Sequence, residues 1–437
     1  MKTFFYTSLL SALLLLSGCG NEVENLGGNT RPITGAPNKG TFVSSVEGLE
    51  FTRTLAPVAQ TTDKAAAYSY RTGELVRFHV GNLDIGESIG ISVITPKEIV
   101  AYKNLDLNTS IYSSEVNNRI RLLMQLDSDS ISENGIQISK ETRTAAYTWT
   151  TPDYSLNETE FEASVLSATA GSVALSISKN AAEDHFTEAL RCVYSGAYRG
   201  SWLLPSGEKE GFVGVMIQSN GGIVALGDGQ DVDGIDNNND GNFLDDVIYA
   251  TGTHEMDTGL YDFNQTYHFD ATLGRIVDST ITNIQGSGNS LGYNKVSGVF
   301  VQDGQNGMYT ASRVGEGKNT SLRYTGFGRG NSGGSAAYVT ANNIDPILGL
   351  FTLDISADGN VTGLIHDARS NEEPSLTGTM NFTTGDIQLN LNSGLGHTLS
   401  GNIDFENTHA ILLDWQDENG TNLGYIDGIG CQLQPHN

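Results

Sequence analysis

The sequence predicts a mainly β chain, in which a small α+β module near the N-terminus precedes an antiparallel β barrel or sandwich. Three observations support this fold class. Glycine is frequent, with 52 of the 437 residues, and stretches rich in helix-forming residues are scarce. Beyond residue 192, segments of alternating apolar and polar residues recur at short intervals. Between them lie Asx-Gly or Thr-Gly turns, which supply the positive φ angles that tight hairpins need, at 219–222, 357–360, 383–386 and 418–421.

The N-terminal residues have the pattern of a bacterial lipoprotein signal. Lys2 supplies a positive charge, the apolar run 8–16 is too short to span a bilayer, and residues 16–19 (LSGC) have the form of a lipobox. We therefore expect residues 1–18 to be a signal peptide and Cys19 to carry the lipid that anchors the chain. An ordinary secretory signal that ends in Cys is the alternative. Gly20 follows instead of Asp, which favours the outer membrane.

Residues 19–40 are rich in Asn, Gly, Pro and Thr, and we expect them to form a flexible tether. No later stretch approaches 18 consecutive apolar residues, so the lipid is the expected membrane attachment. The formal charge is −27, from 24 Lys and Arg against 51 Asp and Glu. A chain this acidic repels nucleic acid, and it suits a solvated surface or divalent cations.

Residues 41–191 have mixed patterns that predict a compact α+β module. Strands are expected at 46–51 and 75–81, and a helix at 115–127 with one apolar face. A second helix is expected at 180–190, where Asn180 and Glu183 have the spacing of a capping box. The apolar stripe of this second helix consists of Ala182, Phe186, Ala189 and Leu190.

Several motifs occur in a fixed order in this module: 48–51 (GLEF), 68–81 (YSYRTGELVRFHVG), 95–96 (TP), 118–129 (NRIRLLMQLDSD) and 134–138 (NGIQI). This order resembles a module near the N-terminus of surface lipoproteins of gammaproteobacteria, some of which carry adhesive or hydrolytic domains behind it. The resemblance covers about a third of the chain and implies an outer-membrane location rather than an activity. Ser130 stands where the family has Gly in its Asp-x-Asp-Gly run, which argues against a metal at Asp127 and Asp129.

The chain has three cysteines, Cys19, Cys192 and Cys431. Because the lipid consumes Cys19, Cys192 and Cys431 are expected to pair in an oxidising envelope, with two free buried thiols as the alternative. The disulfide would close residues 192–437 into one antiparallel β domain. Within it, the segment 211–226 is similar to 349–364 at a constant offset of 138 residues, and each copy has the pattern of a strand, a turn and a returning strand. Two such copies would fit a barrel or sandwich built in halves, and chance similarity among glycine-rich hairpins is the alternative.

The strongest local motif is an acidic segment that predicts a calcium site. Side chains with oxygen ligands stand at alternating positions of this segment, and a glycine allows the chain to turn. A hard cation of the size of Ca²⁺ requires this arrangement. With Asp236 as the first position, the twelfth is Val247, so the Glu of an EF-hand is missing and Asp245 or Asp246 would replace it. A solvated turn without metal is the alternative. The candidate ligands are Asp231, Asp233, Asp236, Asn238, Asp240, Asn242, Asp245 and Asp246.

Catalytic motifs are weaker. Ser332, in a Gly-Asn-Ser-Gly-Gly run, would need His254 and Asp270 or Asp278 to form a serine-protease triad. Thr258 breaks a His-Glu-x-x-His zinc motif, and a glycosidase would need two carboxylates that can be distant in sequence. Trp202 and Trp415 are expected in strands, either in the core or stacked on a sugar.

Together these patterns predict a lipid-anchored, outward-facing lipoprotein of the outer membrane that acts in binding or adhesion. A glycan or a protein at the cell surface is the expected ligand, with calcium at the acidic segment. The alternative is an envelope hydrolase, either a glycosidase or a serine-protease-like enzyme.

Overall fold

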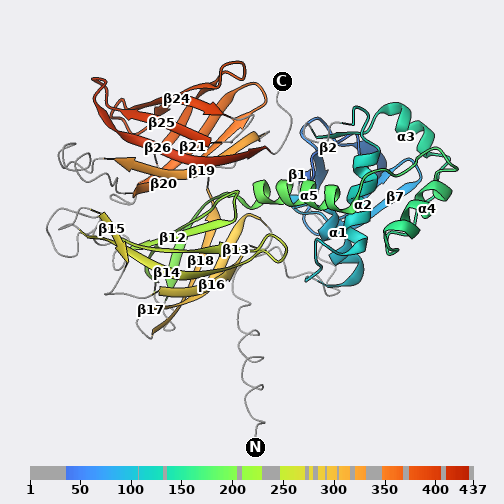
Figure 1. The fold of residues 1–437 in the computed structure, drawn as a ribbon, viewed down its shortest axis with the longest axis horizontal. Coiled ribbons are helices and arrows are strands. Elements are labelled where there is room, and N and C mark those ends of the chain that lie inside the picture. The colour runs from blue at the N-terminus through green and yellow to red at the C-terminus, as the bar shows by residue number, and fades with distance from the viewer. Residues whose placement is uncertain are drawn as a thin grey trace, which may run out of the picture.

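The computed structural model describes residues 36–106, 108–130, 135–203, 209–228, 247–270, 275–278, 284–290, 293–302, 305–314, 320–330, 347–367, 374–404 and 410–432. The prediction of a mainly β chain is confirmed, because strands hold 49% of the residues and helices 19%. Three bodies are visible in Figure 1: a mixed region of strands and helices, and two β barrels that lie beside each other. Helix α5 (Lys179–Tyr194) leads from the mixed region to the barrels. None of the described helices is long and apolar enough to cross a membrane.

The mixed region comprises residues 38–194. Its strands are β1 (Asn38–Phe42), β2 (Val46–Glu47), β3 (Glu50–Arg53), β4 (Ala56–Thr61), β5 (Ala67–Tyr70), β6 (Leu75–Val80), β7 (Leu83–Ile89), β8 (Val93–Ile94) and β9 (Ile136–Gln137). Its other helices are α1 (Pro96–Asn104), α2 (Ser114–Gln125), α3 (Lys140–Ala146) and α4 (Glu158–Ala168). The strands form sheets of order β4-β3-β6-β7 and β5-β1-β8 and a pair β2-β9.

The predicted strands and helices of this region are present with shifted ends. The strand expected at 46–51 is divided, because Gly48 has a φ of +75° and ends β2 before β3 begins. Helix α2 buries its predicted apolar face, including Val116 and Ile120, and its N-cap is Ser113. The predicted cap of α5 is wrong: Ser178 accepts a hydrogen bond from the Ala181 amide and starts the helix two residues before the predicted capping residue.

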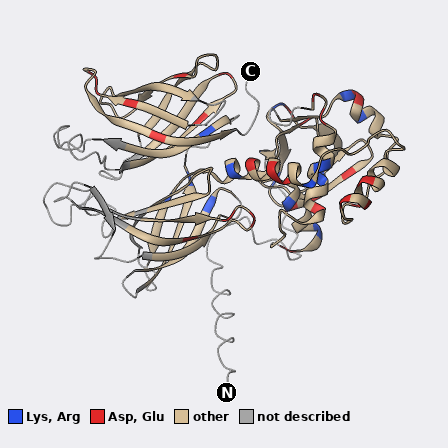
Figure 2. Cartoon of the chain, in the orientation of Figure 1, with Lys and Arg blue, Asp and Glu red and all other residues tan. Residues whose placement is uncertain are grey.

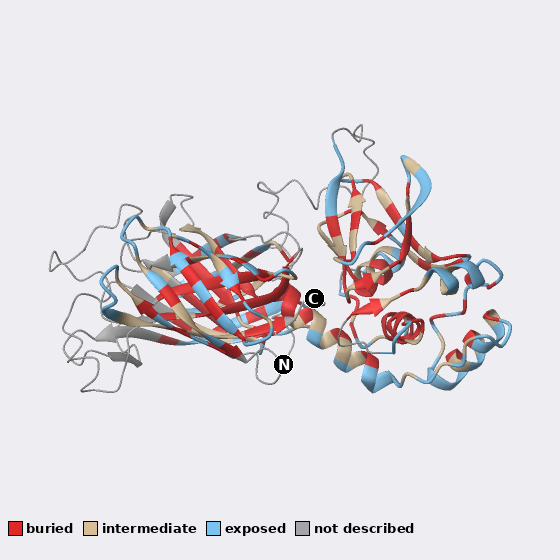
Figure 3. Cartoon of the chain, turned by 90° about the horizontal axis from the view of Figure 1, so that it is seen from above, coloured by how far each residue is buried: buried red, intermediate tan, exposed pale blue. Residues whose placement is uncertain are grey.

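Helix α5 also passes through the predicted domain boundary at 191/192. It continues to Tyr194, so Cys192 lies in its last turn and not in a strand. Strand β10 follows directly after Ser195, the C-cap residue. One hydrophobic core runs from Phe42 of the mixed region through Tyr194 to the first barrel, whereas the second barrel has a separate core. Figure 3 shows the buried residues concentrated along the barrel strands and inside the mixed region.

The first barrel is built from β10 (Gly196–Leu203), β11 (Lys209–Ile217), β12 (Gly222–Asp228), β13 (Val247–His254), β14 (Leu260–Asp270), β15 (Arg275–Asp278), β16 (Ile284–Asn289), β17 (Lys295–Gln302) and β18 (Gln305–Arg313). Its sheet has the order β13-β12-β11-β10-β18-β17-β16-β14-β15. Strand β13 also pairs with β14, which closes a ring of eight antiparallel strands, and β15 extends from β14 outside the ring.

The second barrel is built from β19 (Thr320–Gly330), β20 (Ile347–Ser356), β21 (Asn360–Asp367), β22 (Ser375–Met380), β23 (Asp386–Leu391), β24 (Thr398–Asp404), β25 (Ala410–Gln416) and β26 (Asn422–Gln432). These eight strands follow one another around a closed barrel, and β26 returns to pair with β19. All connections within the barrel therefore join neighbouring strands.

The internal repeat corresponds to equivalent hairpins of the two barrels. Hairpins β11–β12 and β20–β21 are the second and third strands of their respective barrels. Gly221 and Gly359 occupy matching turn positions with φ angles of 86° and 80°. The region beyond residue 192 thus contains two closed barrels where the sequence predicted one barrel or sandwich.

The disulfide Cys192–Cys431 should contribute substantially to stability. Replacing both cysteines with serine is expected to lower the free energy of unfolding by about 2–5 kcal/mol, because the unfolded chain gains the freedom that the cross-link removes. Urea denaturation of the double variant against the wild type measures this. Mass mapping under non-reducing conditions provides the direct check, and recovery of both thiols in free form would contradict the bridge.

Candidate functional site

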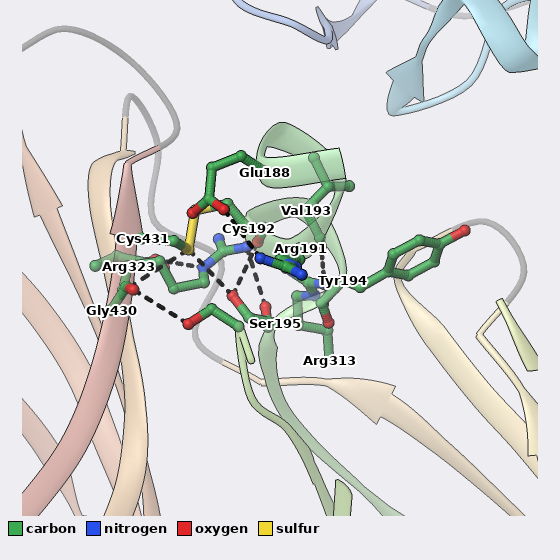
Figure 4. Close-up of a disulfide and its surroundings, with 12 residues drawn as sticks. Glu188, Arg191, Cys192, Val193, Tyr194, Ser195, Arg313, Arg323, Gly430 and Cys431 are labelled. Carbon is green, nitrogen blue, oxygen red and sulfur yellow. Dashed lines mark hydrogen bonds and ion pairs between the residues drawn. A yellow bond between two sulfur atoms is a disulfide. The ribbon is translucent and has the colours of Figure 1, made fainter. Parts of the chain in front are cut away.

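The end of α5 lies where the mixed region and the two barrels meet, and its contacts attach both barrels to the helix. Cys192 in its last turn forms a disulfide with Cys431 on β26, with a Cα–Cα distance of 5.4 Å, as the sequence predicted. Ser195 donates a hydrogen bond from Oγ to the Cys192 carbonyl (2.9 Å). Ser219, in the β11–β12 turn, donates to the carbonyl of Gly430 (3.1 Å) and so ties the first barrel to β26. Figure 4 shows Ser195 and Gly430 beside the disulfide. We call the residues of these contacts, with Arg313, Arg323 and Asp354, the α5 junction.

Two arginines complete the α5 junction, of which Arg323 is buried and Arg313 is half-buried. Arg323 of β19 forms an ion pair with the facing Asp354 of β20 (Nε–Oδ1 2.8 Å). Arg313, at the end of β18, donates to the carbonyl of Val193 (2.5 Å) and to the hydroxyl of Tyr198 (2.7 Å). Burial lowers the pKa of Arg313 from its ordinary value, but an arginine remains charged at neutral pH. The carbonyls at the end of α5 stabilise that charge, as the negative end of a helix dipole does.

The described core of the first barrel contains a cluster of aromatic side chains among aliphatic ones. Tyr261 and Tyr309 are 3% and 6% exposed, and the Tyr309 hydroxyl donates to that of Tyr261 (2.8 Å). Burial raises the pKa of both phenols. Gly288 provides the space for these rings, because a Cβ there would lie 2.5 Å from both hydroxyls. Trp202 packs edge-to-face on Phe300, which places it in this aromatic cluster.

The described core of the second barrel consists mainly of aliphatic side chains, to which every strand contributes. The aromatic side chains of Tyr324, Phe351 and Trp415 also belong to this core. Trp415 is 6% exposed and its indole N–H donates to Nδ1 of His397 (3.4 Å), so it belongs to the core. Small eight-stranded barrels can be filled by their own side chains, and the described core residues of both barrels are closely packed in this way.

Each barrel has a junction end beside α5 and an opposite loop end. At the loop end of the second barrel, the turns 392–397 and 417–421 lie side by side, because Thr398 pairs with Gln416 where both hairpins begin. A Cβ at Gly396 would lie 3.1 Å from the Cβ of Glu418, which shows that the two turns are in contact. We call these two turns the tip and take it as the candidate binding site.

The tip combines an apolar side chain with fixed polar groups. Leu395 is 60% exposed. Asp417 accepts hydrogen bonds from the amides of Asn419 (2.9 Å) and Thr421 (2.8 Å), which lowers the pKa of its carboxyl. Because Trp415 donates to Nδ1 of His397, that imidazole carries its own proton on Nε2. The arrangement offers contact area, a carboxylate and an N–H donor, which suits recognition.

The sequence analysis did not identify the tip. In the sequence, the sign of this site is Leu395, which stands between two glycines in a turn. An apolar side chain in a turn has no neighbouring strand to cover it.

The predicted calcium ligands Asp231, Asp233, Asp236, Asn238, Asp240, Asn242, Asp245 and Asp246 lie outside the described residues, as does Cys19. The segment that contains these ligands connects β12 to β13 at the loop end of the first barrel, where Asp228 pairs with Val247. Within the described part of the chain, no group of three His, Cys, Asp or Glu residues could hold a metal ion.

The described residues of the serine-protease hypothesis lie far apart in the first barrel. Ser332 lies outside the described residues. His254 lies at the junction end, with its ring 4.6 Å from that of Tyr194. His254 pairs with Tyr261 at the start of β14, whereas Asp270 is the last residue of that strand, nine residues further on. Asp278 of β15 pairs with Tyr267, which also lies in the second half of β14. Strand length therefore separates His254 from either aspartate.

His254 instead forms a pair with Ser290 that the sequence did not predict. Its Nε2 lies 2.8 Å from the Ser290 hydroxyl, and that hydroxyl donates to the carbonyl of Gly259 (3.0 Å). Ser290 is fully buried, so no substrate can reach its oxygen. The pair is a structural element at the junction end and not a nucleophile with its base.

The chain was compared with family models, with curated proteins and with solved structures. No family model matches it, and no curated protein matches it. Among solved structures, a redesigned β barrel matches with a TM-score of 0.20 and 10% identity over 29% of this chain and 96% of that chain. Transferrin-binding protein B from Haemophilus parasuis (a mutant) and from Neisseria meningitidis match with TM-scores of 0.17 and 0.18 and identities of 9% and 7%, each over 55% of this chain and 76% of the other. TM-scores this low support no inference about function.

The ion pair in the α5 junction gives a sharp stability test. Asp354→Ala should lower the free energy of unfolding by about 3–5 kcal/mol, because it leaves the buried Arg323 guanidinium without its carboxylate. The double variant Arg323→Met/Asp354→Leu should recover most of this loss, since it removes both charges. Chemical denaturation of the three proteins distinguishes these effects, and equal destabilisation of the single and double variants would contradict the assignment.

Proposed function

We propose that this chain is a lipid-anchored surface lipoprotein of the outer membrane that binds a glycan or a protein through the loop end of its barrels. The observation that carries the proposal is the tip, where exposed Leu395 lies on a rigid hairpin pair beside the hydrogen-bonded carboxylate of Asp417. The described core residues of both barrels are packed, whereas the turns of the tip offer exposed side chains for contact. Binding residues commonly lie on turns that a rigid scaffold positions.

The position of the N-terminal strand supports an outward orientation. Strand β1, the first described element, belongs to the mixed region, whereas the tip lies at the opposite end of the molecule's long axis in Figure 1. A lipid on Cys19 would hold the mixed region near the membrane and leave the loop ends distal. The proposed lipobox of residues 16–19 supplies that anchor.

The distribution of charge favours the same orientation. Residues 196–437 contain 29 Asp and Glu against nine Lys and Arg, whereas residues 36–195 contain 20 against 13. Figure 2 shows the basic residues that the structure describes mostly in the mixed region and near the α5 junction. An anionic membrane surface repels the barrels more strongly than the mixed region, so electrostatics would hold the barrels outward.

Calcium forms a second part of the proposal. The acidic segment 231–246 has alternating oxygen ligands and connects two strands at the loop end of the first barrel. Binding of a cation there would offset the repulsion among its carboxylates and order the segment next to the binding end. Affinity in the range of roughly 10⁻⁴–10⁻³ M is typical of extracellular sites of this kind.

The described residues do not support the serine-protease form of the hydrolase alternative. His254 lies at the junction end of β13, whereas Asp270 and Asp278 lie on the far half of β14 and on its partner β15. The binding function therefore accounts better for the described structure.

The tip should carry the binding energy. Leu395→Asp is expected to abolish binding to the ligand that an array of glycans and matrix proteins identifies, because it places a new charge in the contact surface. Leu412→Asp is the matched control: Leu412 is 59% exposed on the wall of the same barrel, away from the tip, and its replacement should leave binding intact.

Two results would refute the proposed function. One is equal binding by both variants. The other is full resistance of the barrels to protease applied to intact cells, which would place them inside the envelope.

Calcium should stabilise the protein in the millimolar range. At ten times its dissociation constant, a ligand that binds the folded state alone adds about 1.4 kcal/mol to the free energy of unfolding. Thermal melts with calcium and with a chelator measure this gain, which Asp236→Ala should reduce. If the wild type and Asp236→Ala melt alike with and without calcium, the segment binds no metal.

A further inference from the structure

A five-residue turn of the first barrel forms the contact with the mixed region. This turn, 255–259, connects β13 to β14, and Asp257 lies at its centre. One carboxylate oxygen of Asp257 accepts the amide of Ile111 (2.6 Å), the other accepts the hydroxyl of Ser110 (3.0 Å), and its carbonyl accepts Nζ of Lys97 (2.5 Å). We call this set of contacts the joint. Tyr293 and Asn294 extend it by donating to Glu98 and Ser92 (2.7 and 2.8 Å).

His254 is the last residue of β13, immediately before the turn 255–259, and Ser290 links its side chain to that turn. The Ser290 hydroxyl has one proton, which it donates to the carbonyl of Gly259, so the bond to His254 requires the proton to be on Nε2 of the imidazole. The Nδ1 atom is then an acceptor that has no hydrogen-bond partner among the described residues, and the side chain is only 6% exposed. A chain of two hydrogen bonds thus connects the neutral imidazole to the same turn that carries Asp257.

The surroundings of His254 do not accommodate a second proton. The rings of Tyr194 of α5 and Tyr261 of β14 lie 4.6 and 6.2 Å from the imidazole. A proton on Nδ1 would add a buried charge and a donor without an acceptor. Burial and the nearby ammonium of Lys97 lower the pKa of His254 to about 4.

The acidic groups around the joint are engaged elsewhere. Glu98 accepts Tyr293 and, with its second oxygen, the amide of Thr95 (2.8 Å). Glu255 accepts the hydroxyl of Thr258 (3.0 Å), and Asp257 accepts Ser110 and Ile111. These groups and Lys97 are the charged residues that face the turn from α1 and from the turn itself. Each carboxylate has a partner other than the imidazole.

We propose that His254 makes the joint an acid-sensitive latch, in which protonation of the imidazole releases the turn 255–259 from the mixed region while both barrels stay folded. Released from the joint, an imidazole has an ordinary pKa near 6.5. The closed state binds the proton less tightly than the open state, so its stability is complete above about pH 6.5 and decreases as the pH falls towards 4. The equilibrium between closed and open joints should shift by up to about 300-fold below pH 4.

Hydrogen–deuterium exchange of the full lipidated protein in detergent tests this latch. Protection of peptides that contain Ile111 and Gly259, corrected for the intrinsic effect of pH on exchange, should fall as the pH is lowered from 7 to 4. Peptides from the second barrel should keep their protection. The loss should reverse on neutralisation.

The variants His254→Gln and His254→Phe remove the titrating group. Gln can still donate to Ser290, and Phe keeps the packing on the tyrosine rings, so at least one should retain a closed joint that no longer responds to pH. His397→Gln, in the second barrel, should keep the response of the wild type. The latch is refuted if both His254 variants lose protection over the same pH range as the wild type, or if the wild-type joint stays protected at pH 4.

Discussion

The disulfide at the end of α5 is the interaction on which the rest of the structure depends. Cys192 closes the helix that leaves the mixed region, and Cys431 lies on the last strand of the last barrel, so one covalent bond connects elements 239 residues apart. Arg323 and Asp354 are buried around it, and removing one partner of such a pair costs far more than removing both. The junction therefore determines how both barrels meet the helix.

The contacts of the α5 junction lie at one end of each barrel, so the opposite end is left for the recognition of a ligand. The packed aromatic and aliphatic interiors stabilise the barrels without the connecting loops. Loops at the opposite end can then differ in length and composition at little cost in stability. The exposed Leu395 belongs to this end, as does the pair of Asp228 and Val247 between which the acidic segment lies in the sequence.

The junction end of the first barrel has a second role because it also faces the mixed region. Here the two bodies share a continuous apolar core, but their polar contacts converge on one turn. A neutral imidazole under that turn connects the geometry of the joint to the acidity of the surroundings. The disulfide and the joint thus differ in kind: one is covalent and permanent, and the other depends on the protonation of His254.

Local chemistry in the sequence determined the strands, the glycine turns and the pairing of Cys192 with Cys431, because periodicity, positive φ angles and the number of thiols can be evaluated without knowing the fold. The repeat at an offset of 138 residues also indicated two related units. Closure into two separate barrels was decided only by the tertiary structure, since it depends on pairing between distant strands, β10 with β18 and β19 with β26. The same holds for the burial of His254 against Ser290 and for the contact between the two turns of the tip, because each requires segments that only the folded chain brings together.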